Sequence, residues 1–131
     1  MWWFIAQLIT KELDVENLIL LCPAVYDKKS FNVKFNDWFT EIIREPNSRK
    51  NSHSFDILKS FKWNLLIVIG KKDNVIPKWI TEKIYDSSCN SKSREILRLD
   101  DADHMLHFFF KDNPNIFKWI FRTFLINNLT N

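Results

Sequence analysis

Three short apolar runs restrict the fold of this chain more than any other feature of its sequence. Two of them, at residues 18–22 and 65–69, are continuous, and a third at 96–99 is also rich in β-forming residues. Continuous runs of this length are typical of strands buried on both faces, as in parallel sheets. Segments with helical spacing flank them, at residues 3–12, 31–45, 77–86 and 114–127. Alternating strands and helices predict an α/β fold with three parallel strands and flanking helices.

Proline marks the start of two predicted helices. Pro77 and Pro114 each stand in a first turn, where a missing N–H costs little, and Asn113 is a candidate cap for the second helix. The polar stretch at residues 47–54 is expected to be a loop. Since the chain opens within a helix and has few strands for a parallel sheet, we expect residues 1–131 to form a single partial α/β domain.

Glycine is almost absent from the sequence. Gly70 is the only one, where average usage of about 7% would give roughly nine. A single glycine cannot build a G-x-G-x-x-G dinucleotide loop, a phosphate-binding loop or an intact G-x-S-x-G nucleophile turn. These three kinds of site are therefore excluded as self-contained features of residues 1–131.

The charge pattern argues against a nucleic-acid partner. Nineteen basic and 16 acidic residues give a net charge of +3, which is mild. Lysines also alternate with acids, as in Lys72–Asp73 and Lys111–Asp112, whereas a phosphate-binding surface is more segregated. We expect a mixed, solvated surface and no nucleic-acid partner.

The cysteines and the apolar segments favour a cytoplasmic protein without a membrane span. Cys22 lies in an apolar run and Cys89 in a polar stretch, and neither has a C-x-x-C partner. A lone exposed thiol suits a reducing compartment. No signal peptide is recognisable at residues 1–9, and no apolar run approaches the ~20 residues of a span. The run at 117–126 is interpreted as a helix covering the sheet, with a membrane-surface helix as the alternative.

Two chemistry-bearing side chains follow neighbouring strands. Asp73 comes shortly after the second apolar run and His104 shortly after the third. Ligands of open α/β sheets bind at the carboxyl ends of the strands. A buried carboxylate that accepts an imidazole N–H fixes the tautomer of the histidine and stabilises its protonated form. Each residue alone is explained as well by a turn or loop role, but the pair in this order indicates the acid and base of a nucleophilic triad.

Three segments carry a family resemblance. LLIVIGKKDNVIP is similar to the strand, Gly-x-x-Asp turn and helix start of α/β-hydrolases, LDDADHMLHFF to their Ala-x-His stretch, and LILLCPAVYD to the strand after their nucleophile helix. The chain thus resembles the C-terminal portion of an α/β-hydrolase of the serine esterase, thioesterase and peptidase type. The resemblance implies that Asp73 is the triad acid, that His104 is the base, and that the substrate is a small acyl compound: a carboxylic ester, thioester or small amide.

The chain departs from that family at the nucleophile. Its opening, Met1, Trp2 and Trp3, resembles the helix start directly after the family's serine, so the catalytic serine itself is missing and tryptophans stand where the family has glycines. Ser30, Ser54 and Ser60 lack the context of a nucleophile turn. We therefore expect residues 1–131 alone to be inactive, although the family they resemble is catalytic.

Two other candidate groups have simpler explanations. Cys22 ends a strand, but a buried apolar thiol has a raised pKa and is inert. His104 and His107 are one helical turn apart, yet no convincing third metal ligand accompanies them. His53 is expected to be a solvated loop residue. We expect no cofactor and no metal.

Residues 27–62 form a short cap-like insertion between the first two strands. Its apolar side chains at helical spacing either line an acyl pocket or belong to the core, and they are Phe31, Phe35, Trp38, Phe39 and Ile42. The alternative to a hydrolase is a non-catalytic α/β remnant that folds or functions only with a partner or as an oligomer, with self-association through the exposed sheet edge. A receiver-like or flavodoxin-like domain is disfavoured, since it needs an acidic cluster or phosphate loop early in the chain.

Overall fold

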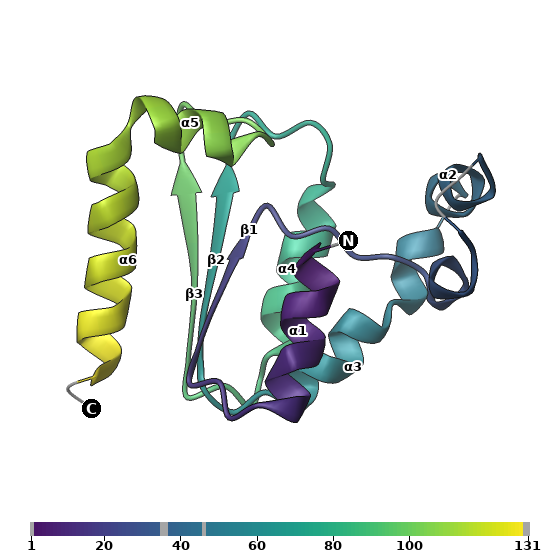
Figure 1. The fold of residues 1–131 in the computed structure, drawn as a ribbon, viewed down its shortest axis with the longest axis horizontal. Coiled ribbons are helices and arrows are strands. Elements are labelled where there is room, and N and C mark those ends of the chain that lie inside the picture. The colour runs from purple at the N-terminus through teal and green to yellow at the C-terminus, as the bar shows by residue number, and fades with distance from the viewer. Residues whose placement is uncertain (1, 35–36, 46, 130–131) are drawn as a thin grey trace.

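The computed structural model describes residues 2–34, 37–45 and 47–129, which form three layers with a parallel sheet in the middle (Figure 1). The helices and strands are α1 (Trp2–Glu12), β1 (Asn17–Leu21), 3₁₀ helix η1 (Lys28–Asn32), α2 (Asp37–Arg44), 3₁₀ helix η2 (Ser48–Asn51), α3 (His53–Ser60), β2 (Asn64–Gly70), α4 (Lys78–Ser87), β3 (Ser93–Leu99), α5 (Leu106–Asp112) and α6 (Pro114–Leu129). The predicted α/β fold with three parallel strands and flanking helices is confirmed.

The strands lie in the order β1-β2-β3, and both pairings are parallel. Asn17 is level with Asn64, and Asn64 is level with Ser93. These three side chains form a polar ladder, in which Asn64 Nδ2 donates to Asn17 Oδ1 and Ser93 Oγ donates to Asn64 Oδ1. All three strands therefore begin level with one another, and their carboxyl ends share one edge of the sheet.

The two faces of the sheet bury separate hydrophobic clusters. On one face, Leu65 and Ile67 pack with side chains of α3 and α4, while on the other Leu66 and Val68 pack with α5 and α6. In Figure 1 α1, α3 and α4 cover one side of the sheet and α6 the other, with α5 across the end where the arrows point. Burial on both faces explains why the apolar run of β2 is continuous rather than alternating.

The first half of the insertion differs from the prediction. The single helix predicted at residues 31–45 is wrong: η1 ends at Asn32, Val33 is extended, and α2 begins at Asp37. Asp27 accounts for the early turn, because its side chain accepts a hydrogen bond from the Lys29 N–H at 2.9 Å. Asn47 then adopts a left-handed conformation with φ of 67° before η2.

The predicted loop at residues 47–54 contains the 3₁₀ helix η2 and is wrong at its end, where α3 begins. Ser52 caps α3, because its hydroxyl accepts a hydrogen bond from the Ser54 N–H, so the helix begins at His53. From α3, Phe55 and Leu58 belong to the hydrophobic core on the α4 side of the sheet. The later part of the 27–62 insertion is thus part of the main body.

The cap-like part of the insertion packs mainly on itself. The principal neighbours of α2 are η1 and η2, and Figure 1 shows it at the far side of the molecule from α6. Phe39 is buried with its ring 5.9 Å from that of Tyr26, whereas Trp38 is 68% exposed. The side chains of Phe31 and Phe35 lie outside the described residues. Phe39 is thus a buried packing residue.

No helix among the described residues has both the length and the hydropathy needed to cross a membrane. The helix α6 covers the sheet, as expected, through Ile120 and Phe124, which are 2% and 6% exposed. Its other face leaves Trp119 60% exposed.

The layered core predicts a contrast between two identical substitutions. Val68 is fully buried in the central strand, and Val75 is 55% exposed. We expect Val68→Ala to lower the free energy of unfolding by about 2 kcal/mol and Val75→Ala by less than about 0.5 kcal/mol. Urea denaturation followed by circular dichroism measures both. Equal losses would contradict the assignment of β2 to the centre of the core.

Candidate active site

The candidate site lies where β2 and β3 end. The side chains of Asp73 and His104 meet there, with the imidazole Nδ1 3.0 Å from the carboxylate Oδ2. The Asp73 side chain is 6% exposed and that of His104 30%. The expected contact between these two side chains is therefore present, with the carboxylate buried and the imidazole within reach of solvent.

Asp73 is held by its own loop. Its Oδ1 accepts hydrogen bonds from the N–H groups of Val75 and Ile76 at 2.8 and 3.0 Å. Burial by itself raises the pKa of Asp73, but the Ile76 N–H, His104 and the Val75 N–H outweigh it and hold the pKa below the ordinary value. The carboxylate is thus ionised near neutral pH, and since it can only accept, Nδ1 of His104 carries the donated proton.

The one glycine of the chain, Gly70, lets the loop after β2 and the loop after β3 approach each other. A Cβ built on Gly70 would lie 2.3 Å from the carbonyl oxygen of Ala102 and 2.5 Å from that of Asp103, which no side chain tolerates. The same Ala102 oxygen accepts the Lys72 N–H, and the Leu99 oxygen accepts the Lys71 N–H. Only glycine fits at position 70, because the histidine loop (residues 100–105, between β3 and α5) crosses directly over the end of β2.

The turn that presents His104 is ordered by Asp103. Its Oδ1 accepts a hydrogen bond from the Met105 N–H at 2.7 Å. Leu106, buried at 3% exposed, then begins α5 and anchors the loop in the core. The helix α5 was absent from the sequence prediction, because its run of three phenylalanines has no clear helical period.

Cys22 stands beside the Asp73–His104 pair. It follows β1 with φ of 42°, a left-handed conformation that is uncommon for a residue with a side chain, and its N–H donates to the Val68 oxygen at 2.7 Å. Burial raises the pKa of the Cys22 thiol to about 12. The expectation of a buried, unreactive thiol is thus supported, but its closeness to Asp73 was not anticipated.

A cavity of about 570 Å³ opens next to His104. Its walls come from the end of β1, the histidine loop, α5 and the start of α6, and the apolar members include Leu106, Phe110 and Phe117. Lys111 and Lys118 lie among the lining residues. The volume is within the range of small-molecule sites.

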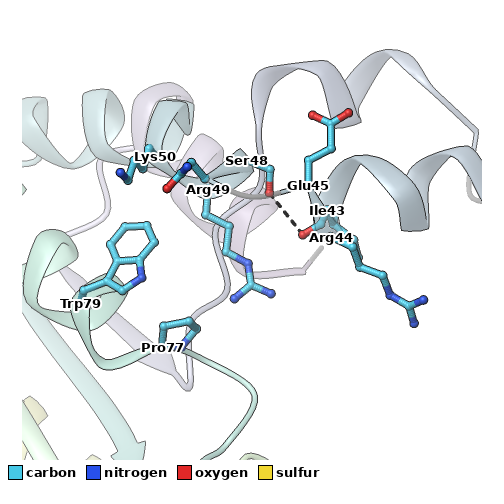
Figure 2. A pocket seen from close by; sticks show the side chains of 9 residues that line it. Ile43, Arg44, Glu45, Ser48, Arg49, Lys50, Pro77 and Trp79 are labelled. Atoms are coloured by element: carbon cyan, nitrogen blue, oxygen red, sulfur yellow. Dashed lines mark hydrogen bonds between the residues drawn. The ribbon is translucent and has the colours of Figure 1, made fainter.

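A second cavity, of about 330 Å³, lies between η2 and the start of α4 and is separate from the Asp73–His104 pair (Figure 2). Figure 2 shows Arg49 extending toward Pro77, with Trp79 on one side and Arg44 directed outward. Ser48 Oγ donates to the Ile43 oxygen at 3.2 Å and closes the turn above it. Cationic side chains surround this cavity without converging on one point.

None of the three serines considered as nucleophiles hydrogen-bonds to Asp73 or His104. Ser30 Oγ donates to the Asp27 oxygen and Ser60 Oγ to the Ile57 oxygen, while the Ser54 hydroxyl is buried without a partner. Within the described ranges, no serine hydroxyl hydrogen-bonds to His104. Met1 lies outside the described residues, as do the side chains of Trp2 and Trp3.

No family model and no curated protein matches the sequence. The structure, however, is similar to the Pyrococcus furiosus esterase Pf2001, with a TM-score of 0.63 and 18% identity, and to Rv0554 of Mycobacterium tuberculosis, with 0.60 and 14%. A candidate non-haem bromoperoxidase of M. tuberculosis H37Rv, BpoC, gives 0.60 and 14% as well. Each similarity covers 96% of this chain.

The chain has part of the α/β-hydrolase fold. It spans 50% of the esterase, 62% of Rv0554 and 64% of BpoC. The resemblance inferred from the three sequence segments is thereby confirmed for the fold. At these identities the similarity concerns the backbone fold alone.

The loop crossing at Gly70 predicts a specific defect. Gly70→Ala forces the Ala102 carbonyl away, so we expect a loss of about 1–3 kcal/mol in the free energy of unfolding together with a broken Asp73–His104 contact. Chemical denaturation measures the first effect and the imidazole NMR signals the second.

Lys71→Ala is the matched control from the same loop, since it removes only an exposed ion pair to Asp100 and should cost less than about 0.5 kcal/mol. If Gly70→Ala were as mild as this control, the close approach of the two loops would be refuted.

Proposed function

We propose that this chain supplies the acid and base of a serine hydrolase that acts on a carboxylic ester, a thioester or a small amide. The observation that carries the proposal is the 3.0 Å contact between His104 Nδ1 and Asp73 Oδ2 at adjacent strand ends of an α/β-hydrolase fold. In this arrangement the carboxylate orients the imidazole, and the second ring nitrogen is left for proton transfer.

The chemistry follows from the tautomer. With Nδ1–H donated to Asp73, Nε2 of His104 carries a lone pair and accepts the proton of a serine hydroxyl as that oxygen attacks the acyl carbon. Asp73 stabilises the resulting imidazolium, which then gives its proton to the departing alkoxide, thiolate or amine. In the second half-reaction Nε2 takes a proton from water as the water oxygen attacks the acyl-enzyme. The imidazolium then returns that proton to the serine oxygen as the carboxylic acid product leaves.

The nucleophilic serine is proposed to come from outside residues 1–131. The printed sequence holds no G-x-S-x-G turn, and the thiol of Cys22, with its pKa near 12, is a poor substitute. In the described sheet β1 pairs only with β2, so its other edge is open to a further parallel strand. A strand added there would end beside Cys22, on the same edge of the sheet as His104.

The cavity beside His104 supports an acyl compound as the substrate. Leu106, Phe110 and Phe117 give it apolar walls, and His104 itself lies at its boundary. An acyl chain bound against these side chains would leave its carbonyl carbon near the imidazole. We also propose a cytoplasmic location, since Cys22 and Cys89 are both free thiols.

The second candidate is a non-catalytic remnant that associates with itself or a partner. It is favoured by the open edge of β1 and by exposed apolar side chains on α6, among them Trp119, Leu125 and Ile126. Analytical ultracentrifugation distinguishes the two: a concentration-independent monomer would count against this candidate.

The proposal predicts how the chain responds to a serine-directed probe. Residues 1–131 alone should not be labelled by a fluorophosphonate, because they lack an activated serine. A polypeptide extended by the coding sequence upstream of Met1, if that sequence encodes a strand and a G-x-S-x-G turn, should be labelled and should hydrolyse a simple aryl ester.

In that extended protein His104→Gln should reduce kcat by at least about 10⁴-fold, while His53→Gln, a change at an exposed residue of α3, serves as the matched control with little change. Labelling of any residue in 1–131 alone, or an active His104→Gln variant, would refute the assignment.

A further inference from the structure

The side chains of Cys22, Asp73 and His104 form a donor set that no step of the proposed hydrolysis uses as a whole. One ligand atom from each of the three residues lies within 4.8 Å of the other two. The set combines a sulfur, an oxygen and a nitrogen, the mixture that zinc and related divalent ions prefer over magnesium or calcium. Within the part of the chain that the structure describes, this is the only such group.

We propose that Cys22, Asp73 and His104 constitute a binding site for a zinc-class divalent cation. Zinc bonds of about 2.0–2.3 Å at tetrahedral angles place ligand atoms roughly 3.3–3.8 Å apart. The three donors are therefore already close to the required spacing, and side-chain adjustments of about 1 Å would complete it. Three protein ligands leave a fourth position for water or for the carbonyl oxygen of Asp103, which is 3.9 Å from the Cys22 sulfur.

Two of the donors are fixed in advance by neighbours that are not ligands. The N–H groups of Val75 and Ile76 occupy Oδ1 of Asp73, which leaves Oδ2 directed at the other donors. The left-handed backbone of Cys22, tied to the Val68 oxygen, turns the sulfur toward the histidine loop. Such supporting hydrogen bonds are what orient ligands in metal sites.

The cation also has a route to the site. The 570 Å³ cavity is lined by both Cys22 and His104, so the donors are reached from solvent on that side. The cavity wall holds Lys111 and Lys118 but no carboxylate, so the negative charge for a cation is concentrated at Asp73 and at the thiolate that forms on binding.

Binding would exchange protons in a defined way. The thiol of Cys22 loses its proton to solvent as the sulfur–metal bond forms, because a coordinated thiol is deprotonated by the charge of the ion. The ligand nitrogen of His104 in this proposal is Nδ1, because it is the ring atom 3.0 Å from Asp73 Oδ2. Its proton is lost from that atom while Nε2 becomes protonated, so Nδ1 can donate its lone pair. Metal binding and the Asp73–His104 hydrogen bond are consequently mutually exclusive.

The exclusion gives the site a regulatory consequence that rests on the proposed function. A bound cation would withhold both the acid and the base of the hydrolase, so zinc would act as an inhibitor of that activity. Metal binding itself does not depend on the hydrolase proposal, and its test uses no activity measurement.

Cobalt(II) is the probe, because a thiolate ligand gives it a near-ultraviolet charge-transfer band and a tetrahedral site gives it intense visible bands. Titration of the 131-residue chain should produce both sets of bands with an end point at one ion per chain, and zinc should displace the cobalt. Cys22→Ser should abolish the charge-transfer band, whereas Cys89→Ser, the matched control at the exposed thiol, should retain it.

His104→Gln provides a second variant that does not alter a fully buried side chain. It should weaken cobalt binding by more than about 10-fold, while His53→Gln, at an exposed residue of α3, should leave binding unchanged. Failure of the parent chain to give the charge-transfer band would overturn the proposal, as would persistence of that band in Cys22→Ser. A metal-free result would leave the serine-hydrolase proposal intact, and an inactive extended enzyme with a normal cobalt titration would refute only that proposal.

Discussion

The crossing of the histidine loop over the end of β2 is the constraint on which the site depends. The crossing is possible because Gly70 has no side chain, and a Cβ there would meet the carbonyl oxygens of Ala102 and Asp103. Once the loops are in place, the buried carboxylate of Asp73 accepts the Nδ1–H of His104 at 3.0 Å. In a chain with one glycine, that glycine is found where a side chain would separate the acid from the base.

The layered core fixes the positions of the two strand ends that carry this contact. The central strand β2 is buried on both faces. Its packing therefore fixes the positions at which the loops after β2 and β3 leave the sheet. The register from Asn64↔Ser93 to Gly70↔Leu99 brings both strands to their ends together. The packing of many apolar residues thus determines the positions of two polar ones. These two lie at the carboxyl ends of the strands, where α/β proteins bind their ligands.

Much of the fold could be predicted because β2 is an unbroken apolar run and proline marks the starts of two helices. The insertion could not be predicted, since the Asp27 carboxylate accepts a hydrogen bond from the Lys29 N–H and the Ser52 hydroxyl caps α3, and both override the apolar spacing. The meeting of Asp73 and His104 was predictable because parallel strands end at one edge. The position of Cys22 was not, because it depends on the register of β1 against β2 and on a left-handed backbone that leaves no mark in the sequence.

The most direct test of the Asp73–His104 contact is the protonation of the His104 ring, read from its imidazole nitrogen and N–H proton NMR signals at neutral pH. We predict a proton on Nδ1, with a strongly downfield signal that is lost in Asp73→Asn and retained in Asp101→Asn, which changes an exposed carboxylate in the loop that carries His104. A proton on Nε2 instead, or a signal indifferent to Asp73→Asn, would show that the carboxylate does not hold the imidazole and would contradict the assignment of Asp73 and His104 as acid and base.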